Sequence, residues 1–283
     1  MKLLRFGPLG HERPGILDAE GRARDLSGQI DDIAGAVLSD ETLARIRDVD
    51  VASLPLAPDD ARLAPCVGQV GKFMGIGLNY ADHAAETGME PPPEPVLFTK
   101  HTSCIGGAYD DVVLPRGSET TDWEVELGVV IGKAAKYVDQ KNALSHVAGY
   151  CVVNDVSERT FQKGVGQWVK GKSCDTFGPL GPWLVTRDEV SDPQALELWL
   201  DVNGERRQTG NTSTMIFPVA FLISYLSTFF TLHPGDVIAT GTPPGVGMGM
   251  KPQVFLKPGD EMHLGVGDLG EQRQRVVSFQ ENT

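Results

Sequence analysis

Three acidic residues, Asp122, Glu124 and Glu126, alternate with apolar residues along one stretch of the chain. Because successive side chains of a β-strand point to opposite faces, this spacing predicts that the three carboxylates share one face of a strand. The stretch continues as Val-Val-Ile over 129–131, which indicates that its far end is deeply buried. Like charges that are adjacent and buried repel one another unless a cation neutralises them.

A further carboxylate, Asp155, follows an apolar run that begins at Tyr150. A set of oxygen ligands suits a hard cation, Mg²⁺ or Mn²⁺, with positions left for water and substrate. Zinc is disfavoured because no set of histidines and cysteines has the spacing of zinc ligands. The spacing alone leaves two interpretations open, a cation site and a solvated acidic strand face.

The chain of 283 residues carries 38 acidic and 25 basic side chains, which gives a formal net charge of −13. An acidic protein binds nucleic acid or an anionic membrane poorly, because phosphate groups are repelled. The composition therefore disfavours both partners and is compatible with a bound cation. The length suits one large domain, with or without a small additional region.

One motif suggests a different chemistry. Residues 166–173, GQWVKGKS, match the phosphate-binding pattern G-x-x-x-x-G-K-[ST]. That loop requires a buried strand before it and a helix after it, because the helix N-terminus helps to hold the phosphate. The residues before it do not resemble a buried strand, and the glycines and prolines over 178–182 prevent a following helix. We therefore reject an NTPase.

The elements that position these residues are predicted to be mainly strands. Short apolar or β-branched runs bounded by turn residues predict strands over 112–114, 125–131, 151–153, 196–202, 237–240 and 262–266. Helices are predicted around 81–86, 157–162 and 218–228. Because the strands do not alternate with long helices, the expected fold class is α+β, mainly β, with a mostly antiparallel core.

Residues 1–66 are predicted to form a small N-terminal β-rich region, and residues 67–283 the main domain. Strands are expected near 2–6 and 14–18, and Ser39 is the expected N-cap of a helix. The uncharged segment 215–232 just reaches the length of a membrane span, but its proline and hydroxyl residues predict a buried helix instead.

The four cysteines have no close spacing, and a chain of this size does not need disulfides. We therefore expect reduced thiols and a cytoplasmic protein, since the N-terminus also lacks the pattern of a secretory signal. The cysteines are Cys66, Cys104, Cys151 and Cys174.

Six short motifs occur in order along the chain. They are GLNYADH at 77–83, EPVLFTK at 94–100, DWEVE at 122–126, NDVSER at 154–159, GKS at 171–173 and TGTPPGVG at 240–247. Together they resemble the fumarylacetoacetate hydrolase family, in particular its smaller bacterial members of the acylpyruvase type. The resemblance implies a β-roll or sandwich of mixed sheets in which 67–283 is the catalytic domain. It also implies a homodimer with one Mg²⁺ or Mn²⁺ in each site.

The resemblance also implies roles for single residues. Lys172 would be the active-site lysine, close to the metal and to the developing negative charge of the substrate. The metal ligands would be Glu124, Glu126 and Asp155, the same group that the spacing selects. Substrate contacts would come from Lys100, Arg159, Gln162, Thr176, Thr240 and Thr242.

His83 and Glu86 lie three residues apart, which places them on one face of a helical turn. An exposed pair of this kind is common on surface helices. The resemblance implies instead that the pair sits on a lid that closes over the metal, where His83, oriented by Glu86, would act as a general base.

The activity implied by the resemblance is metal-dependent hydrolysis of a C–C bond in a 2,4-diketo acid, which gives pyruvate or a related 2-oxo acid. A sugar-derived substrate such as 2,4-diketo-3-deoxy-L-fuconate or -rhamnonate is favoured by overall resemblance. The alternatives are an isomerase or decarboxylase of a related 2-oxo acid, and an activity of the ureidoglycolate lyase type. A non-catalytic carboxylate-binding protein is disfavoured, since binding alone needs no acid–base pair.

Overall fold

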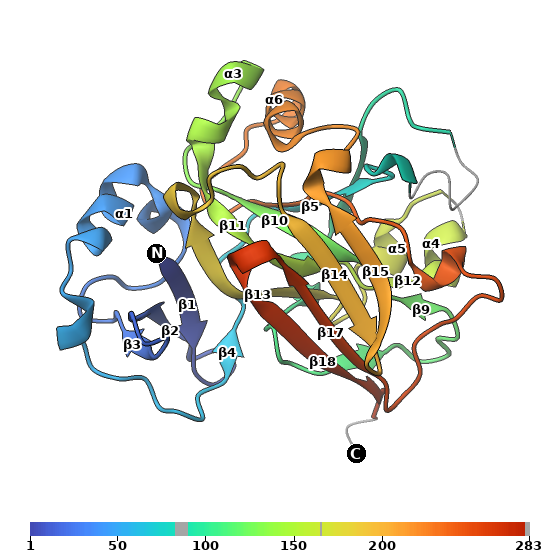
Figure 1. Ribbon diagram of the computed structural model, residues 1–283, viewed down its shortest axis with the longest axis horizontal. Helices are drawn as coiled ribbons and strands as arrows, with labels where there is room; N and C mark the ends of the chain where they lie inside the picture. Colours follow the sequence, from blue (N-terminus) through green and yellow to red (C-terminus); the bar gives the residue numbers. More distant parts are fainter. Residues whose placement is uncertain (83–89, 165, 281–283) are drawn as a thin grey trace.

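The computed structural model describes residues 1–82, 90–164 and 166–280, and its largest sheet runs through the middle of the molecule (Figure 1). Its strands are, in spatial order, β3 (Ala23–Asp25), β2 (Arg13–Leu17), β1 (Lys2–Phe6), β13 (Gly178–Thr186), β11 (Val147–Asn154), β10 (Val125–Ile131), β16 (Val237–Ala239), β5 (Phe73–Gly77) and β6 (Val96–Lys100). Two short strands extend it, β4 (Leu63–Ala64) beside β1 and β7 (Ile105–Gly106) beside β13. The β16–β5 and β13–β7 pairs are parallel and the others antiparallel, so the predicted mixed, mainly β fold is confirmed.

Strands β10 and β11 lie in the middle of this sheet, and both of their faces are covered. Every residue of the two strands is buried, and their sequences lack the polar alternation of a half-exposed strand. They pair antiparallel with Val125 opposite Asn154. This register brings the start of β10 to the end of β11, so the two acidic motifs of the sequence meet at one place.

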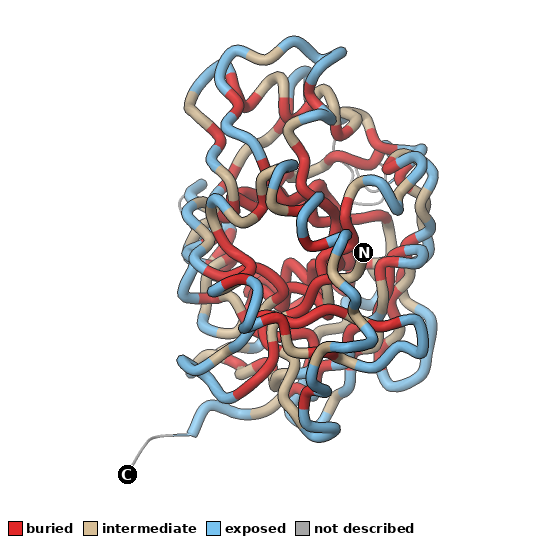
Figure 2. The backbone as a smooth tube through the Cα atoms, turned by 90° about the vertical axis from the view of Figure 1, so that its left-hand side faces the viewer, coloured by how far each residue is buried: buried red, intermediate tan, exposed pale blue. Residues whose placement is uncertain are grey.

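A second sheet packs against the first. Its strands are, in spatial order, β15 (Glu205–Asn211), β14 (Glu197–Val202), β17 (Glu261–Val266), β18 (Glu271–Ser278) and β8 (Val112–Leu114). Buried and exposed residues alternate along β18, so one face of this sheet is covered and the other is solvated. Strands β14 and β17 contact β10, and Figure 2 shows the buried backbone gathered in the middle of the molecule. A short sheet of β9 (Thr121–Asp122) and β12 (Ser157–Glu158) lies beside the start of β10.

The N-terminal residues join the main sheet instead of forming a sheet of their own. Strand β1 pairs antiparallel with β13, with Leu3 opposite Leu184. The predicted helix is present as α1 (Asp40–Arg47), and the side chain of Ser39 accepts a hydrogen bond from the Thr42 amide as expected of an N-cap. The pairing of β1 with β13 thus joins the predicted N-terminal region to the main domain across the expected boundary near residue 66.

The other α-helices within the described residues are α3 (Gln140–Ala143), α4 (Arg159–Lys163), α5 (Val169–Lys172) and α6 (Val219–Phe229). The uncharged segment 215–232 contains α6, and within the described residues no helix has the length and apolarity that a bilayer crossing needs. The predicted helix over 157–162 starts later than expected, because Ser157 and Glu158 pair with β9. The Glu158 carboxylate then caps α4 by accepting a hydrogen bond from the Thr160 amide. The predicted helix over 81–86 falls mostly outside the described residues.

The GQWVKGKS motif does not form a phosphate-binding loop. Helix α4 precedes it where a strand would be required, and α5 is a single turn that ends at Lys172. A Cβ atom on Gly171 would lie 2.4 Å from the Glu158 carbonyl oxygen and 2.5 Å from the Gln162 nitrogen. Glycine therefore lets α5 approach α4 closely, which carries Lys172 into the protein interior.

Candidate active site

The three carboxylates that the sequence singles out meet where β10 begins and β11 ends. Glu124 immediately precedes β10, Glu126 lies on it, and Asp155 immediately follows β11. The Asp155 amide donates to the Glu124 carbonyl oxygen at 2.9 Å, which continues the strand pairing. One carboxylate oxygen from each residue lies within 4.8 Å of the others, and the exposed fractions are 5%, 1% and 0%.

This group fits a hard divalent cation. It offers only oxygen atoms, which Mg²⁺ and Mn²⁺ prefer. Burial, and then the nearby Asp155 and Glu124 carboxylates, raise the pKa of Glu126 well above its ordinary value. A cation between the three side chains would remove this conflict and hold all of them in the ionised form.

Lys172 brings a positive charge to the same place. Its Nζ atom lies 2.5 Å from Oε2 of Glu124 and 2.6 Å from Oδ2 of Asp155. Burial opposes the charged form, but the Asp155 and Glu124 carboxylates outweigh it and raise the pKa of Lys172. Lys172 is therefore an ammonium ion despite being 2% exposed.

Lys100 pairs with the other carboxylate oxygen of Asp155. Its Nζ donates to Oδ1 of Asp155 at 2.5 Å, to the Val156 carbonyl oxygen at 3.3 Å and to the Lys172 carbonyl oxygen. An ammonium has three donors, and these acceptors occupy all of them. The prediction that Lys100 contacts substrate is not supported by this geometry; the side chain orients Asp155 and the end of α5.

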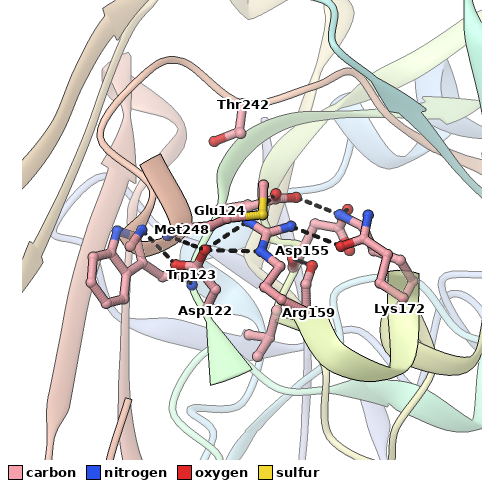
Figure 3. Close-up of polar contacts among 12 residues, drawn as sticks. Asp122, Trp123, Glu124, Asp155, Arg159, Lys172, Thr242 and Met248 are labelled. Carbon is pink, nitrogen blue, oxygen red and sulfur yellow. Dashed lines mark hydrogen bonds and ion pairs between the residues drawn. The ribbon is translucent and has the colours of Figure 1, made fainter. Parts of the chain in front are cut away.

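Arg159, the first residue of α4, lies between two carboxylates in Figure 3. Its Nη2 atom is 2.8 Å from Oδ2 of Asp122 and 2.7 Å from Oε1 of Glu124. Its Nη1 donates to Oε1 of Gln162 at 3.1 Å, which places that amide at the site as well. Burial opposes the charge of Arg159, but Glu124 and Asp122 raise its pKa, so the guanidinium stays charged.

Asp122 shares the acidic pattern but has a different task. Its Oδ1 accepts from the Gly247 amide at 2.7 Å, and its Oδ2 accepts from the Met248 amide at 3.0 Å and from Arg159. The carboxylate therefore fastens the loop after β16 to α4. The expectation that Asp122, Glu124 and Glu126 share one strand face is only partly met, since β9 ends at Asp122 before β10 begins.

Thr240 and Thr242, predicted as contacts for a substrate carboxylate, use their hydroxyl protons elsewhere. Thr240 Oγ1 donates to the Leu127 carbonyl oxygen and Thr242 Oγ1 to the Val125 carbonyl oxygen, both at 2.9 Å. A hydroxyl has one proton to donate, so neither can also donate to an anion. Thr242 lines the cavity described next, whereas Thr240 does not.

Thr176 is also placed away from this cavity. Its hydroxyl accepts a hydrogen bond from the Val113 amide at 2.8 Å, which ties the loop before β13 to β8. Its φ angle of 68° lies in the left-handed region, as is common where a chain turns sharply. The structure does not support a direct contact between Thr176 and substrate.

A cavity of about 180 Å³ opens on the Glu124 and Glu126 side chains. A cavity of about 150 Å³ is enough to hold benzene, so this one suits a small organic acid. Its charged and polar lining residues are Glu124, Glu126, Arg159, Gln162, Lys163, Lys172 and Thr242. The remaining wall is made by Ile76, Gly77, Leu78, Phe98, Trp168 and Met248.

The model of the fumarylacetoacetate (FAA) hydrolase C-terminal family matches residues 72–277, which is most of the chain and includes every residue of the cavity wall. The chain belongs to the fumarylacetoacetate hydrolase family. A Burkholderia cenocepacia strain HI2424 protein, which carries only a general and provisional name of hydrolase, is 65% identical over 282 residues. The alignment covers 99% of this chain and 100% of that protein.

Solved structures of the family have the same fold. Fumarylacetoacetate hydrolase from Exiguobacterium antarcticum is 37% identical, with a TM-score of 0.87 over 99% of this chain and 100% of that one. Maleylpyruvate hydrolase from Sphingobium sp. SYK-6, solved with manganese(II) and pyruvate, is 29% identical, with a TM-score of 0.83 over 99% and 100%. The 2-hydroxyhepta-2,4-diene-1,7-dioate isomerase from Mycobacterium marinum is 31% identical, with a TM-score of 0.78 over 100% of both chains.

The family includes hydrolases and isomerases, so the chain is a hydrolase or a related enzyme. Two of the predicted site residues, His83 and Glu86, lie outside the described residues. Their roles in this member of the family stay predictions from the sequence.

Sequence reasoning missed the apolar wall and the anchoring role of Asp122. Phe98, Trp168 and Met248 come from three separate segments, and no short-range pattern connects them. Trp168 lies within the GQWVKGKS motif, whose resemblance to a phosphate loop hid its role. In the sequence, Asp122 is recognisable only as an acidic residue two positions before Glu124. This spacing grouped it with the candidate ligands and did not indicate its anchoring role.

Proposed function

We propose that the chain is a metal-dependent hydrolase that cleaves a C–C bond in a 2,4-diketo acid of the acylpyruvate type. One observation carries the proposal: three buried carboxylates from two paired strands converge within 4.8 Å beside the buried cations Lys172 and Arg159. The proposed ligands of Mg²⁺ or Mn²⁺ are Glu124, Glu126 and Asp155.

The charges at the site support an anionic substrate. Among the described residues joined by these contacts, three cationic side chains face four carboxylates, which leaves one net negative charge when all are ionised. A divalent cation would reverse this to one net positive charge, which attracts a carboxylate-bearing substrate. The groups are Lys100, Arg159, Lys172, Asp122, Glu124, Glu126 and Asp155.

When bound, the metal would supply charge stabilisation for the oxygen atoms of a 2-oxo acid. Lys172 keeps a positive charge beside the place where negative charge develops as the C–C bond breaks. His83, oriented by Glu86, would take a proton from the water that adds to the distal carbonyl carbon. The electron pair of the broken bond stays with the 2-oxo acid fragment, which then takes up a proton.

The apolar wall narrows the choice of substrate tail. A sugar-derived tail carries several hydroxyl groups, and each hydroxyl placed against Ile76, Phe98 or Met248 would lose a hydrogen bond to water. The described part of the cavity therefore favours a short apolar acyl tail over the sugar-derived tail that overall resemblance suggests.

The resemblance further implies a homodimer, which light scattering on the purified protein would test.

The decisive experiment is a panel of 2,4-diketo acids with short apolar or hydroxylated tails, followed by the loss of their ultraviolet absorbance. Turnover should require Mg²⁺ or Mn²⁺, stop in a chelator, and disappear in Glu124→Ala. Glu197→Ala, which removes an exposed glutamate on β14, should keep full activity. Full activity of the wild type in chelator would contradict the proposal.

A second candidate is isomerisation of a 2-hydroxydiene dioic acid, favoured by the likeness to the Mycobacterium marinum isomerase. Mass spectrometry separates the two reactions, because hydrolysis adds one water and splits the substrate, whereas isomerisation leaves the mass unchanged. An isomerase would convert the diene substrate without releasing a 2-oxo acid.

A further inference from the structure

Three glutamine side chains are fully buried between the two large sheets, where apolar residues would be expected. Gln208 lies on β15, and Gln272 and Gln274 lie on β18, each with 0% exposure. Burying an amide costs free energy unless every polar atom finds a partner. The partners of these amides therefore indicate what each of them is there to hold.

Gln208 reaches across to the start of β10. Its Oε1 accepts from the Val125 amide at 3.0 Å, and its Nε2 donates to Thr242 Oγ1 at 2.7 Å and to the Pro243 carbonyl oxygen at 2.8 Å. The Val125 N–H belongs to the peptide that links Glu124 to Val125. Gln208 thus fixes the orientation of that peptide.

Thr242 fixes the next peptide. Its hydroxyl donates to the Val125 carbonyl oxygen at 2.9 Å, which belongs to the peptide that links Val125 to Glu126. Since Gln208 also donates to Thr242, the three residues form a closed ring of hydrogen bonds. Both peptides between the two glutamates are held by side chains from distant parts of the chain.

These side chains replace a missing strand. Strand β16 pairs with β10 from Gly128 to Val130, and it does not extend as far as Val125. On the other side, β11 continues to Asn154, opposite Val125. Gln208 and Thr242 therefore bond the outer N–H and C=O groups of Val125, between Glu124 and Glu126, where β16 no longer pairs.

We propose that Gln208 and Thr242 are positioning residues that set the separation and orientation of the Glu124 and Glu126 carboxylates for a divalent cation. The inference rests on the proposed function, because it assumes that the glutamates bind metal. Outer contacts of this kind change metal affinity by about 10- to 100-fold when removed, since ligand groups must be held within about 0.5 Å.

The first test compares Gln208→Leu with Gln194→Leu in the full chain. Gln194 is also a glutamine whose amide holds backbone groups, since its Nε2 donates to the Thr212 carbonyl oxygen at 2.8 Å and its Oε1 accepts from the Val219 amide at 2.7 Å, away from the glutamate peptides. Mn²⁺ affinity is measured by electron paramagnetic resonance, and thermal unfolding is measured without metal. Both variants should lose thermal stability, but only Gln208→Leu should weaken Mn²⁺ binding, by about 10- to 100-fold.

Thr242 supplies a second test that does not depend on the folding of Gln208→Leu. Thr242→Val keeps the shape but loses the hydroxyl, so it should weaken Mn²⁺ binding, whereas Thr242→Ser should keep it. If wild type, Gln208→Leu and Thr242→Val bind Mn²⁺ equally, the inference is overturned while the metal site stands. Equal weakening by Gln194→Leu also overturns it, and a wild type that binds no Mn²⁺ overturns the proposed function with it.

Discussion

The Nζ atom of Lys100 lies 2.5 Å from Oδ1 of Asp155, and neither side chain is exposed to solvent. All the donors of this lysine are bonded to protein acceptors. We therefore expect Lys100→Met to lower the stability of the fold and to release Asp155 from its position, without removing a direct contact to substrate. Removing one member of a buried ion pair costs about 3–5 kcal/mol. The free energy of unfolding, measured by urea denaturation, should fall by about that amount.

Arg47→Ala is the control for Lys100→Met. Arg47 is paired with Asp188 at 2.9 Å, but both side chains are about half exposed. Exposed pairs contribute about 0–1 kcal/mol, so this variant should stay within 1 kcal/mol of wild type. A Lys100→Met protein as stable as Arg47→Ala would show that the buried lysine does not stabilise the cluster.

Local spacing predicted which carboxylates come together, because strand alternation and a carboxylate after an apolar run are properties of neighbouring residues. Glu124, Glu126 and Asp155 follow from such patterns. What holds them does not, since Gln208 and Thr242 lie 83 and 117 residues from Val125 along the chain. From the sequence, the Thr242 hydroxyl therefore resembled a hydrogen-bond donor to an anion, although in the structure it donates to a carbonyl oxygen of β10.

The residue ranges of the strands were predicted more reliably than the pairing between strands. The ranges 112–114 and 125–131 agree with β8 and β10, since their apolar residues are buried in any arrangement of the sheets. The helix expected at Ser157 begins two residues later, because the pairing of β12 with β9 depends on contacts with residues 121–122. Tertiary pairing outweighs local helix preference at that position.

Metal binding should depend on pH through Glu126. Burial, together with Asp155 and Glu124, raises the pKa of this carboxyl in the metal-free fold above its ordinary value of 4.5. A metal requires the ionised form, so binding releases a proton and the affinity should weaken as the pH falls below the raised pKa. Titration calorimetry in buffers of different ionisation enthalpy measures this proton release.

The raised pKa of Glu126 also makes the folding stability of the metal-free protein depend on pH, in the opposite direction to the metal affinity. The native state keeps a proton that the unfolded chain loses above about 4.5, so the metal-free protein should lose stability as the pH rises from there. The limit for one group is about 1.4 kcal/mol per pH unit. Glu126→Gln should remove this slope, and equal slopes for the variant and wild type would contradict the assignment.

Trp168 should limit the length of the substrate tail. The Trp168 and Phe98 rings have centroids 5.5 Å apart, and a Cβ atom on Gly77 would lie 2.4 Å from Trp168, so the indole closes tightly over β5. Trp168→Ala should raise kcat/KM for a long apolar tail relative to a short one by about tenfold, since one or two methylenes contribute about 1–3 kcal/mol. Competition between two diketo acids measures the ratio.

Trp199→Ala is the matched control, because Trp199 is also partly buried but lies on β14 against His263, away from the cavity. Its tail preference should equal that of wild type. If Trp168→Ala shows no change in the ratio either, the tail does not extend toward this wall.

His83 and Glu86 are predicted to serve proton transfer without holding the metal. His83→Ala should therefore keep the Mn²⁺ affinity of wild type and lower kcat by about 10²- to 10⁴-fold, the usual contribution of a general base. Glu86→Gln, which keeps the shape of the partner, should cause a smaller loss. Unchanged turnover in His83→Ala would remove this residue from the mechanism.

Asp122→Asn should loosen the loop that carries Met248 into the cavity. The carboxylate accepts hydrogen bonds from the Gly247 and Met248 amides as well as from Arg159, whereas an asparagine would turn an NH₂ group toward one of these donors. Amide hydrogen exchange should accelerate at 247–248, and kcat/KM should fall through a higher KM because the cavity wall is displaced. Asp111→Asn, which affects an exposed pair with Arg275, should change neither. Slow exchange retained at 247–248 in Asp122→Asn would mean that the loop is held by its other contacts, such as the Val254 amide donating to the Gly247 carbonyl oxygen at 3.2 Å.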